Sequence, residues 1–248
     1  MMVYMGSKNR YSEHIVPILQ KAIDDNNVTT YIECFVGGAN IIDKIKCDKR
    51  IGYDRSDTLI ALLRQAAADW DGVLKDGSRE LWDKGKAYVK DGIMPDDMSL
   101  AEIGAMEFFA SFSNGGFPRG YAKNTTTRNY FKEAYRNMEK QAPDLKEIEF
   151  DCQNYWELDE NIQDAVIYLD PPYQGTKIYG YANQPQMNYS DYWDWVRKIS
   201  KNNWVFCSEQ SAPDDFEILW EQDVKRTTNK TNDFKAVEKL FRYKDGKK

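Results

Sequence analysis

The residues with the clearest capacity for chemistry are Asp170-Pro171-Pro172-Tyr173, which directly follow the apolar residues 166–169. The apolar run is typical of a short buried strand, and the prolines end it because they cannot donate backbone hydrogen bonds to a sheet. A carboxylate, a rigid carbonyl group and an aromatic ring therefore stand at the carboxyl end of a strand, where open α/β sheets bind ligands. The alternative is a turn without a ligand, since proline and aspartate also favour turns.

A glycine turn, Gly37-Gly38, is the second candidate for ligand binding. It follows the strand pattern of residues 29–35 and precedes a helical pattern at residues 41–45. Strand, glycine turn and helix form the first unit of a doubly wound nucleotide-binding fold, and adjacent glycines let the backbone approach a ligand closely. Glu33 near the strand end favours a cationic ligand group over phosphate. Neither G-x-G-x-x-G nor G-x-x-x-x-G-K-[ST] occurs, so NAD and ATP are disfavoured, and a plain loop is the alternative.

Asp54 ends the next predicted strand, residues 50–54. It follows Gly37 at close to the spacing of about 20 residues at which a carboxylate meets ribose hydroxyls. Ser56 is then placed to cap a helix with leucines at helical spacing. Further strands are predicted at residues 147–152 and 204–209.

The rest of the chain supplies elements around these strands. A Trp-rich helix is predicted at residues 192–196, and its tryptophans are interpreted as core residues. Residues 174–189 are rich in Gly, Tyr and Asn and predict a loop beside the site. Residues 216–220 and 240–243 predict a closing hairpin, with residues 229–234 as its loop.

Overall charge and composition limit the classes of protein. The net charge is −6 with 7 Trp, 16 Tyr and 11 Phe, and the mean hydropathy is −0.73. No run approaches the roughly 18 apolar residues that span a bilayer, and no signal peptide is recognisable, so a cytoplasmic protein is expected. The four cysteines lie far apart and, with the single His14, predict no metal site. Cys34, Cys152 and Cys207 are expected to be buried reduced thiols.

A local excess of positive charge is hidden by this acidic total. Between residues 119 and 140, six basic residues stand against two acids, with aromatic residues between them. This mixture suits phosphate contact and base stacking, and Arg119, Lys123 and Arg128 are the candidate DNA contacts. Lys132, Arg136 and Lys140 have instead the i, i+4 spacing of a solvated helix face.

The order of these motifs resembles a known family. Tyr4-x-Gly6-Ser7-Lys8, Phe35-x-Gly37-Gly38, Asp54 and Asp170-Pro171-Pro172-Tyr173 occur in the order found in the D12 class of N6-adenine DNA methyltransferases, which contains Dam and its phage relatives. The resemblance covers nearly the whole chain, and residues 208–216 are most similar to phage-encoded members. It implies a Rossmann-like S-adenosylmethionine-dependent α/β sheet formed by residues 1–68 and 145–248. It also implies an inserted, mainly helical target-recognition domain at residues 69–144.

The resemblance further implies which residues bind the cofactor, S-adenosylmethionine. Tyr4 and Lys8 match contacts to its methionine end, and Phe35-Val36-Gly37-Gly38 matches the family's cofactor loop. Glu33 stands where the family frequently has aspartate, which preserves the charge but not the reach. Asp54 matches the ribose-binding acid. The last two matches, Asp151 and Cys152, correspond to the pair that meets the adenine of the cofactor.

Residues 170–173 match the catalytic motif, and their types suit methylation of an amine. The lone pair of an exocyclic amine is delocalised into its ring, which makes the nitrogen a poor nucleophile. Hydrogen bonds from its two protons to the Asp170 carboxylate and the Pro171 carbonyl favour a pyramidal nitrogen, so that positioning and electrostatics replace a strong base. A base in a duplex must be flipped out, and Tyr173 is placed to stack on it. Asp170 is thereby expected to border the cofactor as well.

The sequence therefore predicts a methyltransferase that acts on N6 of adenine in double-stranded DNA, encoded by a bacterium or a phage. Transfer to cytosine N4, RNA or a protein amide is the alternative with the same chemistry. A catalytically silent DNA-binding or cofactor-sensing relative and a nicotinamide oxidoreductase are alternatives of other classes. The sequence does not indicate the target site, a preference for hemimethylated DNA, the oligomeric state or a partner enzyme in a restriction-modification system.

Overall fold

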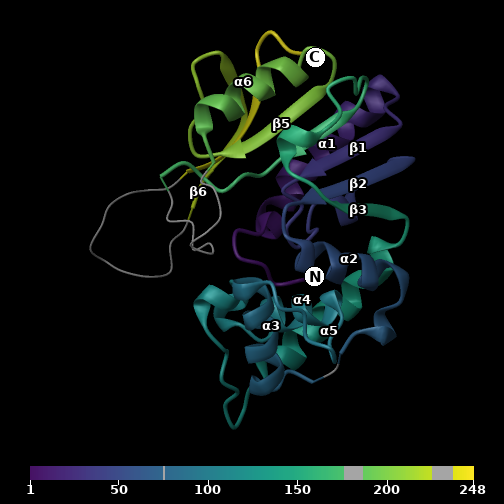
Figure 1. Cartoon of the computed structure of the whole chain (residues 1–248). Helices are drawn as coiled ribbons and strands as arrows, with labels where there is room; N and C mark the ends of the chain where they lie inside the picture. Colours follow the sequence, from purple (N-terminus) through teal and green to yellow (C-terminus); the bar gives the residue numbers. More distant parts are fainter. Residues whose placement is uncertain (75, 176–186, 225–236) are drawn as a thin grey trace.

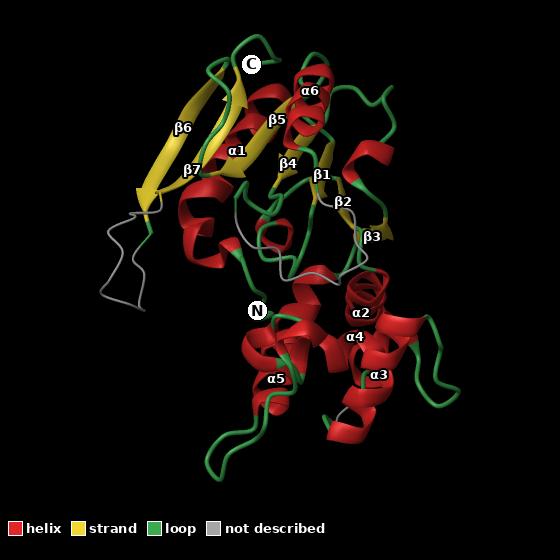
Figure 2. Cartoon of the chain, turned by 60° about the vertical axis from the view of Figure 1, so that its left-hand side comes forward, coloured by secondary structure: helices red, strands yellow, loops and turns green. Residues whose placement is uncertain are grey.

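The computed structural model describes residues 1–74, 76–175, 187–224 and 237–248, which form a mixed sheet with helices on both faces (Figures 1 and 2). The seven strands in these residues have the order β3-β2-β1-β4-β5-β7-β6. Their bounds are β1 (Thr30–Cys34), β2 (Lys49–Asp54), β3 (Ile148–Cys152), β4 (Val166–Leu169), β5 (Trp204–Glu209), β6 (Phe216–Asp223) and β7 (Val237–Tyr243). The expected Rossmann-like α/β sheet is confirmed.

Parallel pairing brings the carboxyl ends of the central strands to one edge. β1 pairs with both β2 and β4 in parallel, with Cys34 opposite Leu169. The chain builds outward from β1 to β2 and β3, and then resumes on the other side of β1 with β4 and β5. The reversal between β1 and β4 is the switch point at which open α/β sheets bind ligands. The residues after β1 and β4 are Phe35 and Asp170, so both predicted motifs lie at this point.

Alternating side chains of the strands bury both faces of the sheet. Tyr31 faces a core that it shares with α1 (Ser12–Asn26), whereas Ile32 faces a core that it shares with α6 (Tyr189–Ile199). The strands are accordingly apolar on both sides, as expected for parallel strands covered by helices. The predicted hairpin is also confirmed, because β6 and β7 pair antiparallel. Its predicted loop at residues 229–234 lies outside the described residues.

Four helices gather at one end of the molecule, away from α6 (Figure 1). They are α2 (Asp57–Ala68), α3 (Arg79–Asp91), α4 (Leu100–Phe109) and α5 (Tyr130–Leu145). Short 3-10 turns connect some of them, and Ser56 caps α2 by accepting a hydrogen bond from the Leu59 amide, as predicted. The inserted region is mainly helical, and its assignment as a separate recognition domain of residues 69–144 stays a prediction.

Three local expectations were wrong. The helix expected at residues 41–45 is only a 3-10 turn, Ile42–Lys44, because the buried chain must return to β2 at Lys49. Cys152 is exposed and not buried, since it ends the edge strand β3. Trp195 is only partly buried and lines a cavity, whereas Trp193 is a core residue. Most of the predicted loop at residues 174–189 lies outside the part that the structure describes.

No helix among the described residues is long and apolar enough to cross a membrane. The same residues contain no cluster of His, Cys, Asp and Glu suited to a metal ion.

Candidate active site

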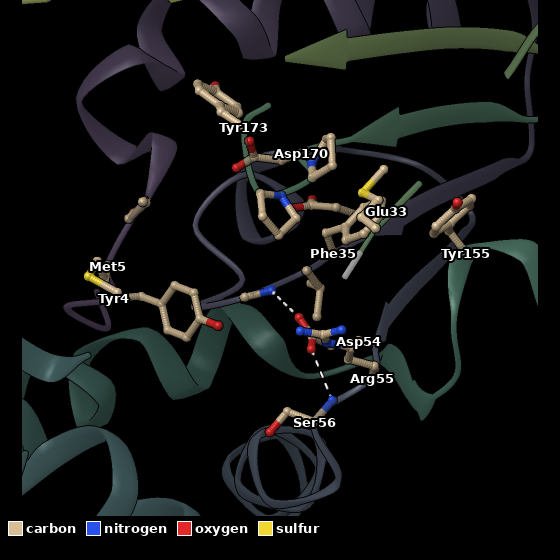
Figure 3. Close-up of a pocket in the computed structure, with 18 of the residues that line it drawn as sticks. Tyr4, Met5, Glu33, Phe35, Asp54, Arg55, Ser56, Tyr155, Asp170 and Tyr173 are labelled. Carbon is tan, nitrogen blue, oxygen red and sulfur yellow. Dashed lines mark hydrogen bonds between the residues drawn. The ribbon is translucent and has the colours of Figure 1, made fainter. Parts of the chain in front are cut away.

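A cavity of about 840 Å³ opens at the carboxyl ends of β1, β2 and β4 (Figure 3). Its walls come from the N-terminal segment, the glycine turn, the residues after β2 and β4, and the helical region near Phe108 and Arg119. The volume is in the range of sites that bury a cofactor-sized molecule. Tyr4, Lys8, Glu33, Phe35, Gly37, Gly38, Asp54 and the whole motif of residues 170–173 line it. Residues widely separated in the sequence thus meet in one place.

Tyr4 packs directly on the glycine turn and explains why the turn needs glycine. A Cβ atom on Gly37 would lie 2.9 Å from the Tyr4 ring, and one on Gly38 would lie 2.9 Å from the Tyr4 Cβ. Gly37 also has a positive φ angle of 50°, and such an angle costs little only for glycine. The backbone is therefore held open toward the cavity, with Tyr4 as its support.

The Asp54 carboxylate accepts hydrogen bonds from the backbone of the glycine turn and of the residues that follow β2. Oδ2 accepts a hydrogen bond from the Gly37 amide at 3.2 Å, and Oδ1 accepts one from the Ser56 amide at 3.1 Å (dashed lines in Figure 3). Burial raises the pKa of Asp54, and these two amides partly offset the effect. A carboxylate has about four acceptor positions, so Asp54 keeps capacity for a ligand hydroxyl.

Two carboxyl groups lie at the cavity: Glu33 is buried, and the side chain of Asp170 is 17% exposed. Asp170 Oδ1 lies 2.7 Å from the Lys8 ammonium, and the Tyr31 hydroxyl donates to Glu33 Oε2 at 3.2 Å. Burial raises the pKa of Asp170, and Lys8 lowers it in part. The pKa of Glu33 is raised well above its usual range by burial and then by the Asp170 carboxylate. A cation in the cavity would relieve both costs, because burial of a charge is expensive unless it is compensated.

Hydrogen bonds with residues of β5, β7 and α6 hold the motif in place. Glu209 at the end of β5 accepts from the Gln174 amide at 3.1 Å, and burial raises its pKa to about 7. The Tyr189 hydroxyl donates to the Pro172 carbonyl. The Tyr173 hydroxyl donates to Glu238 on β7.

The sequence did not indicate Glu209, Tyr189 or Glu238. Glu209 could have been found, since it ends an apolar strand as Asp54 does. Glu238 follows a segment outside the described residues, and its position depends on the pairing of β7 with β5 and β6. No local pattern marks it.

The two residues matched to the adenine of the cofactor lie off the cavity. The Asp151 carboxylate pairs with Arg64 at 2.5 Å, and Cys152 Sγ contacts the Arg55 carbonyl. The adjacent wall is formed by Gln153, Asn154, Tyr155 and Trp156. The rings of Phe35 and Tyr155 lie 5.4 Å apart there, so this end of the cavity is aromatic.

The three candidate DNA contacts differ in position. Arg119 lines the cavity and its guanidinium lies 3.1 Å from the Met5 sulfur. Lys123 is exposed away from the cavity. Arg128 pairs with Glu133 at 2.8 Å and lies over the Tyr130 ring at 4.5 Å, so it would exchange these contacts for a phosphate.

Comparison with known proteins gives one family. The family model described as "D12 class N6 adenine-specific DNA methyltransferase" matches residues 99–203, which include α4, α5, β3, β4 and residues 170–173. No curated protein matches the chain. Two structures of the rRNA methyltransferase aviRa from Streptomyces viridochromogenes share 9% identity with it, over 93% of this chain and 85% of theirs, with TM-scores of 0.40 and 0.38.

Proposed function

We propose that this chain is a methyltransferase of the D12 class of N6 adenine-specific DNA methyltransferases, whose family model matches residues 99–203. In this proposal it transfers the methyl group of S-adenosylmethionine to N6 of an adenine flipped out of duplex DNA. The observation that carries the proposal is Asp170, a mostly buried carboxylate at the switch point that pairs with Lys8 and lines the same cavity as the glycine turn. The family match includes this residue.

The residues at the cavity fit the proposed cofactor. Burial raises the pKa of Glu33 and of the mostly buried Asp170, and a cationic ligand would compensate both carboxylates. S-adenosylmethionine carries a sulfonium and an ammonium group. The glycine turn leaves the backbone accessible, and Asp54 is placed to accept from ribose hydroxyls. Gln153, Asn154, Tyr155 and Trp156 are better placed than Asp151 and Cys152 to meet the purine ring. When bound, S-adenosylmethionine supplies the electrophilic methyl group.

The chain itself orients the amine and keeps its acceptors ready. Lys8 favours the ionised form of Asp170, which is a stronger acceptor for an N–H bond from the adenine amine than the protonated form. The Pro171 carbonyl is the second acceptor, and the bond from Tyr189 to the Pro172 carbonyl steadies the same segment. Tyr173 supplies the stacking surface for the flipped base. Fixed acceptors lower the barrier because they need no reorganisation during the reaction.

The helical region supplies the contacts to DNA in this proposal. Arg119 reaches the cavity from this region and is the primary phosphate or base contact, with Lys123 and Arg128 as outer contacts. Residues 69–144 then act as the target-recognition domain. A basic surface on an acidic chain restricts binding to this side and makes affinity depend on salt.

Methyl transfer from labelled S-adenosylmethionine to duplex DNA tests the proposal, followed by digestion of the product to nucleosides. N6-methyladenine is expected, and Asp170→Asn should lower the rate by at least about 100-fold while cofactor binding persists, because a neutral amide oxygen replaces the charged and stronger carboxylate acceptor. Asp97→Asn, an exposed carboxylate paired with Lys84, is the matched control. N4-methylcytosine or labelled RNA as the product would assign another amine as the substrate. Cofactor binding without transfer to any nucleic acid would refute the enzyme function.

A further inference from the structure

A buried carboxylate behind the catalytic motif contacts one residue of the motif and lies near the lysine that pairs with another. Glu238 on β7 accepts a hydrogen bond from the Tyr173 hydroxyl, and its Oε1 lies 4.0 Å from the Lys8 ammonium. Its side chain is 5% exposed. Glu238 is not among the described residues that line the cavity. Any effect of Glu238 on the reaction must therefore pass through its neighbours.

The neighbours form a compact cluster from three parts of the fold. Lys8 belongs to the 3-10 turn Lys8–Tyr11, lies 2.7 Å from Asp170 and stands over the Tyr173 ring, 4.6 Å from its centre. Burial alone would lower the pKa of Lys8, but Asp170 and Glu238 more than offset this and the pKa is raised. Lys8 thus remains an ammonium over one face of the Tyr173 ring, while Glu238 holds the hydroxyl at the far end.

We propose that Glu238 is a positioning residue that fixes the orientation of the Tyr173 ring for stacking with the target adenine. The inference rests on the proposed function, because it takes Tyr173 as the stacking surface. A hydrogen bond at the para position acts far from the Cα atom, so it restrains both side-chain torsions of the tyrosine. A bond to a carboxylate is stronger than one between neutral groups and suits this task. Holding the ring before the base arrives reduces the cost of ordering it.

The restraint on Tyr173 can be separated from a purely electrostatic role of Glu238. At 4.0 Å from Lys8, Glu238 is beyond hydrogen-bond distance, whereas Asp170 pairs with Lys8 directly. If the charge of Glu238 mattered most, Glu238→Gln would lower the methyl-transfer rate as much as Glu238→Leu. If the acceptor for the Tyr173 hydroxyl matters, Glu238→Gln should keep the rate, because its amide oxygen is still an acceptor.

A double-mutant cycle on methyl transfer tests the inference. Glu238→Leu and Tyr173→Phe should each lower the single-turnover rate about tenfold at saturating cofactor, the effect of losing one hydrogen bond to a charged group. The double variant should be no slower than the slower single variant, since both remove the same bond. Glu238→Gln should retain most of the rate, with the cofactor dissociation constant unchanged in all variants. Glu221→Gln, an exposed carboxylate on β6 that lies 3.8 Å from Lys239, is the control.

A second measurement makes the test independent of turnover. 3-Fluorotyrosine at position 173 should show a shifted fluorine resonance in Glu238→Leu and an unchanged one in Glu221→Gln. Three outcomes would each overturn the inference. The rate losses of the two single variants could multiply in the double variant, or Glu238→Gln could be as slow as Glu238→Leu. The third is a fluorine resonance that does not shift in Glu238→Leu. If the wild-type protein methylates no adenine, the proposed function fails, and the resonance still decides whether Glu238 holds Tyr173.

Discussion

An ionised carboxylate accepts an N–H bond more strongly than a protonated carboxyl group does, but burial opposes ionisation. Asp170 resolves this conflict by its pairing with Lys8, whose side chain is itself buried. Lys8 is far away in the sequence, yet its effect on the protonation of Asp170 is direct. In the proposed reaction we therefore expect Lys8 to affect the pH dependence of the rate, in addition to the cofactor contact expected from the sequence.

Replacement of Lys8 by methionine should move the acid limb of the rate profile to higher pH. The pKa of Asp170 is already raised by burial, and loss of the ammonium removes the opposing influence. At a given pH below the new pKa, less Asp170 is ionised and the rate is lower. Single-turnover rates at saturating cofactor across pH 5 to about 9 check this. Lys21→Met, which alters an exposed pair with Asp25, is the control, and an unmoved acid limb would contradict the prediction.

At the scale of elements, one side chain joins α5 to the glycine turn. Gln141 is 1% exposed. Its amide nitrogen donates to the carbonyls of Gly38 and Ala39, both at 3.1 Å, and to Asp43 Oδ2 at 2.9 Å. Its amide oxygen accepts from the Met2 backbone amide at 2.6 Å. Hydrogen bonds of this one side chain therefore connect the helical region to the N-terminal segment and to the proposed cofactor loop.

Gln141→Leu should weaken cofactor binding about tenfold or more, because the carbonyls of the glycine turn lose their donor and the turn loosens. Isothermal titration with S-adenosylmethionine in the absence of DNA measures this directly. Glu139→Gln, an exposed change on the same helix, should leave the dissociation constant as it is. Equal affinity of Gln141→Leu and wild type for S-adenosylmethionine would show that the turn keeps its shape without the hydrogen bonds from Gln141.

The contact of α2 with α4 depends on one glycine. A Cβ atom on Gly104 would lie 2.2 Å from the Thr58 carbonyl oxygen, which belongs to the backbone and cannot rotate away. Gly104→Ala should therefore lower the melting temperature by several degrees, although alanine favours helices by up to about 1 kcal/mol. Gly85→Ala on α3, whose nearest neighbour is the Phe117 ring at 3.0 Å, should cost less because a side chain can move. A Gly104→Ala protein as stable as wild type would refute the close packing.

The sequence was informative where a local pattern decides the structure. Apolar runs that end in acids predicted β1, β2 and β4 with their site residues, because burial and strand termination act within a few residues. The 3-10 turn after the glycine turn was missed, since the distance back to β2 overrode the helical pattern. Gln141 and Glu238 could not be found, because their roles depend on contacts across 103 and 65 residues of sequence.

For the whole molecule, the buried acids set an unusual dependence of stability on pH. The pKa values of six carboxyl groups are raised, in each case by burial as the largest cause: Glu33, Asp43, Asp54, Asp170, Glu209 and Glu238. A raised pKa means that the folded state binds more protons than the unfolded state, so stability is lost as pH rises. The half-buried pair of Arg197 with Asp215 lowers the pKa of Asp215, so this pair adds stability that is lost only as pH falls into the acidic range.

Glu209 gives this argument a defined pH window. Its pKa rises from 4.5 to about 7, so the stability that it contributes is fully present below about pH 4.5 and is lost as pH rises toward and through about 7. The free energy of unfolding of the wild type should fall between pH 5 and 7 by up to about 1.4 kcal/mol per pH unit more than that of Glu209→Gln, which keeps an oxygen for the Gln174 amide. Urea unfolding at several pH values measures both slopes, with Glu149→Gln, an exposed partner of Lys49, as control. Parallel slopes for wild type and Glu209→Gln would show that Glu209 ionises in the folded protein as it does in the unfolded chain.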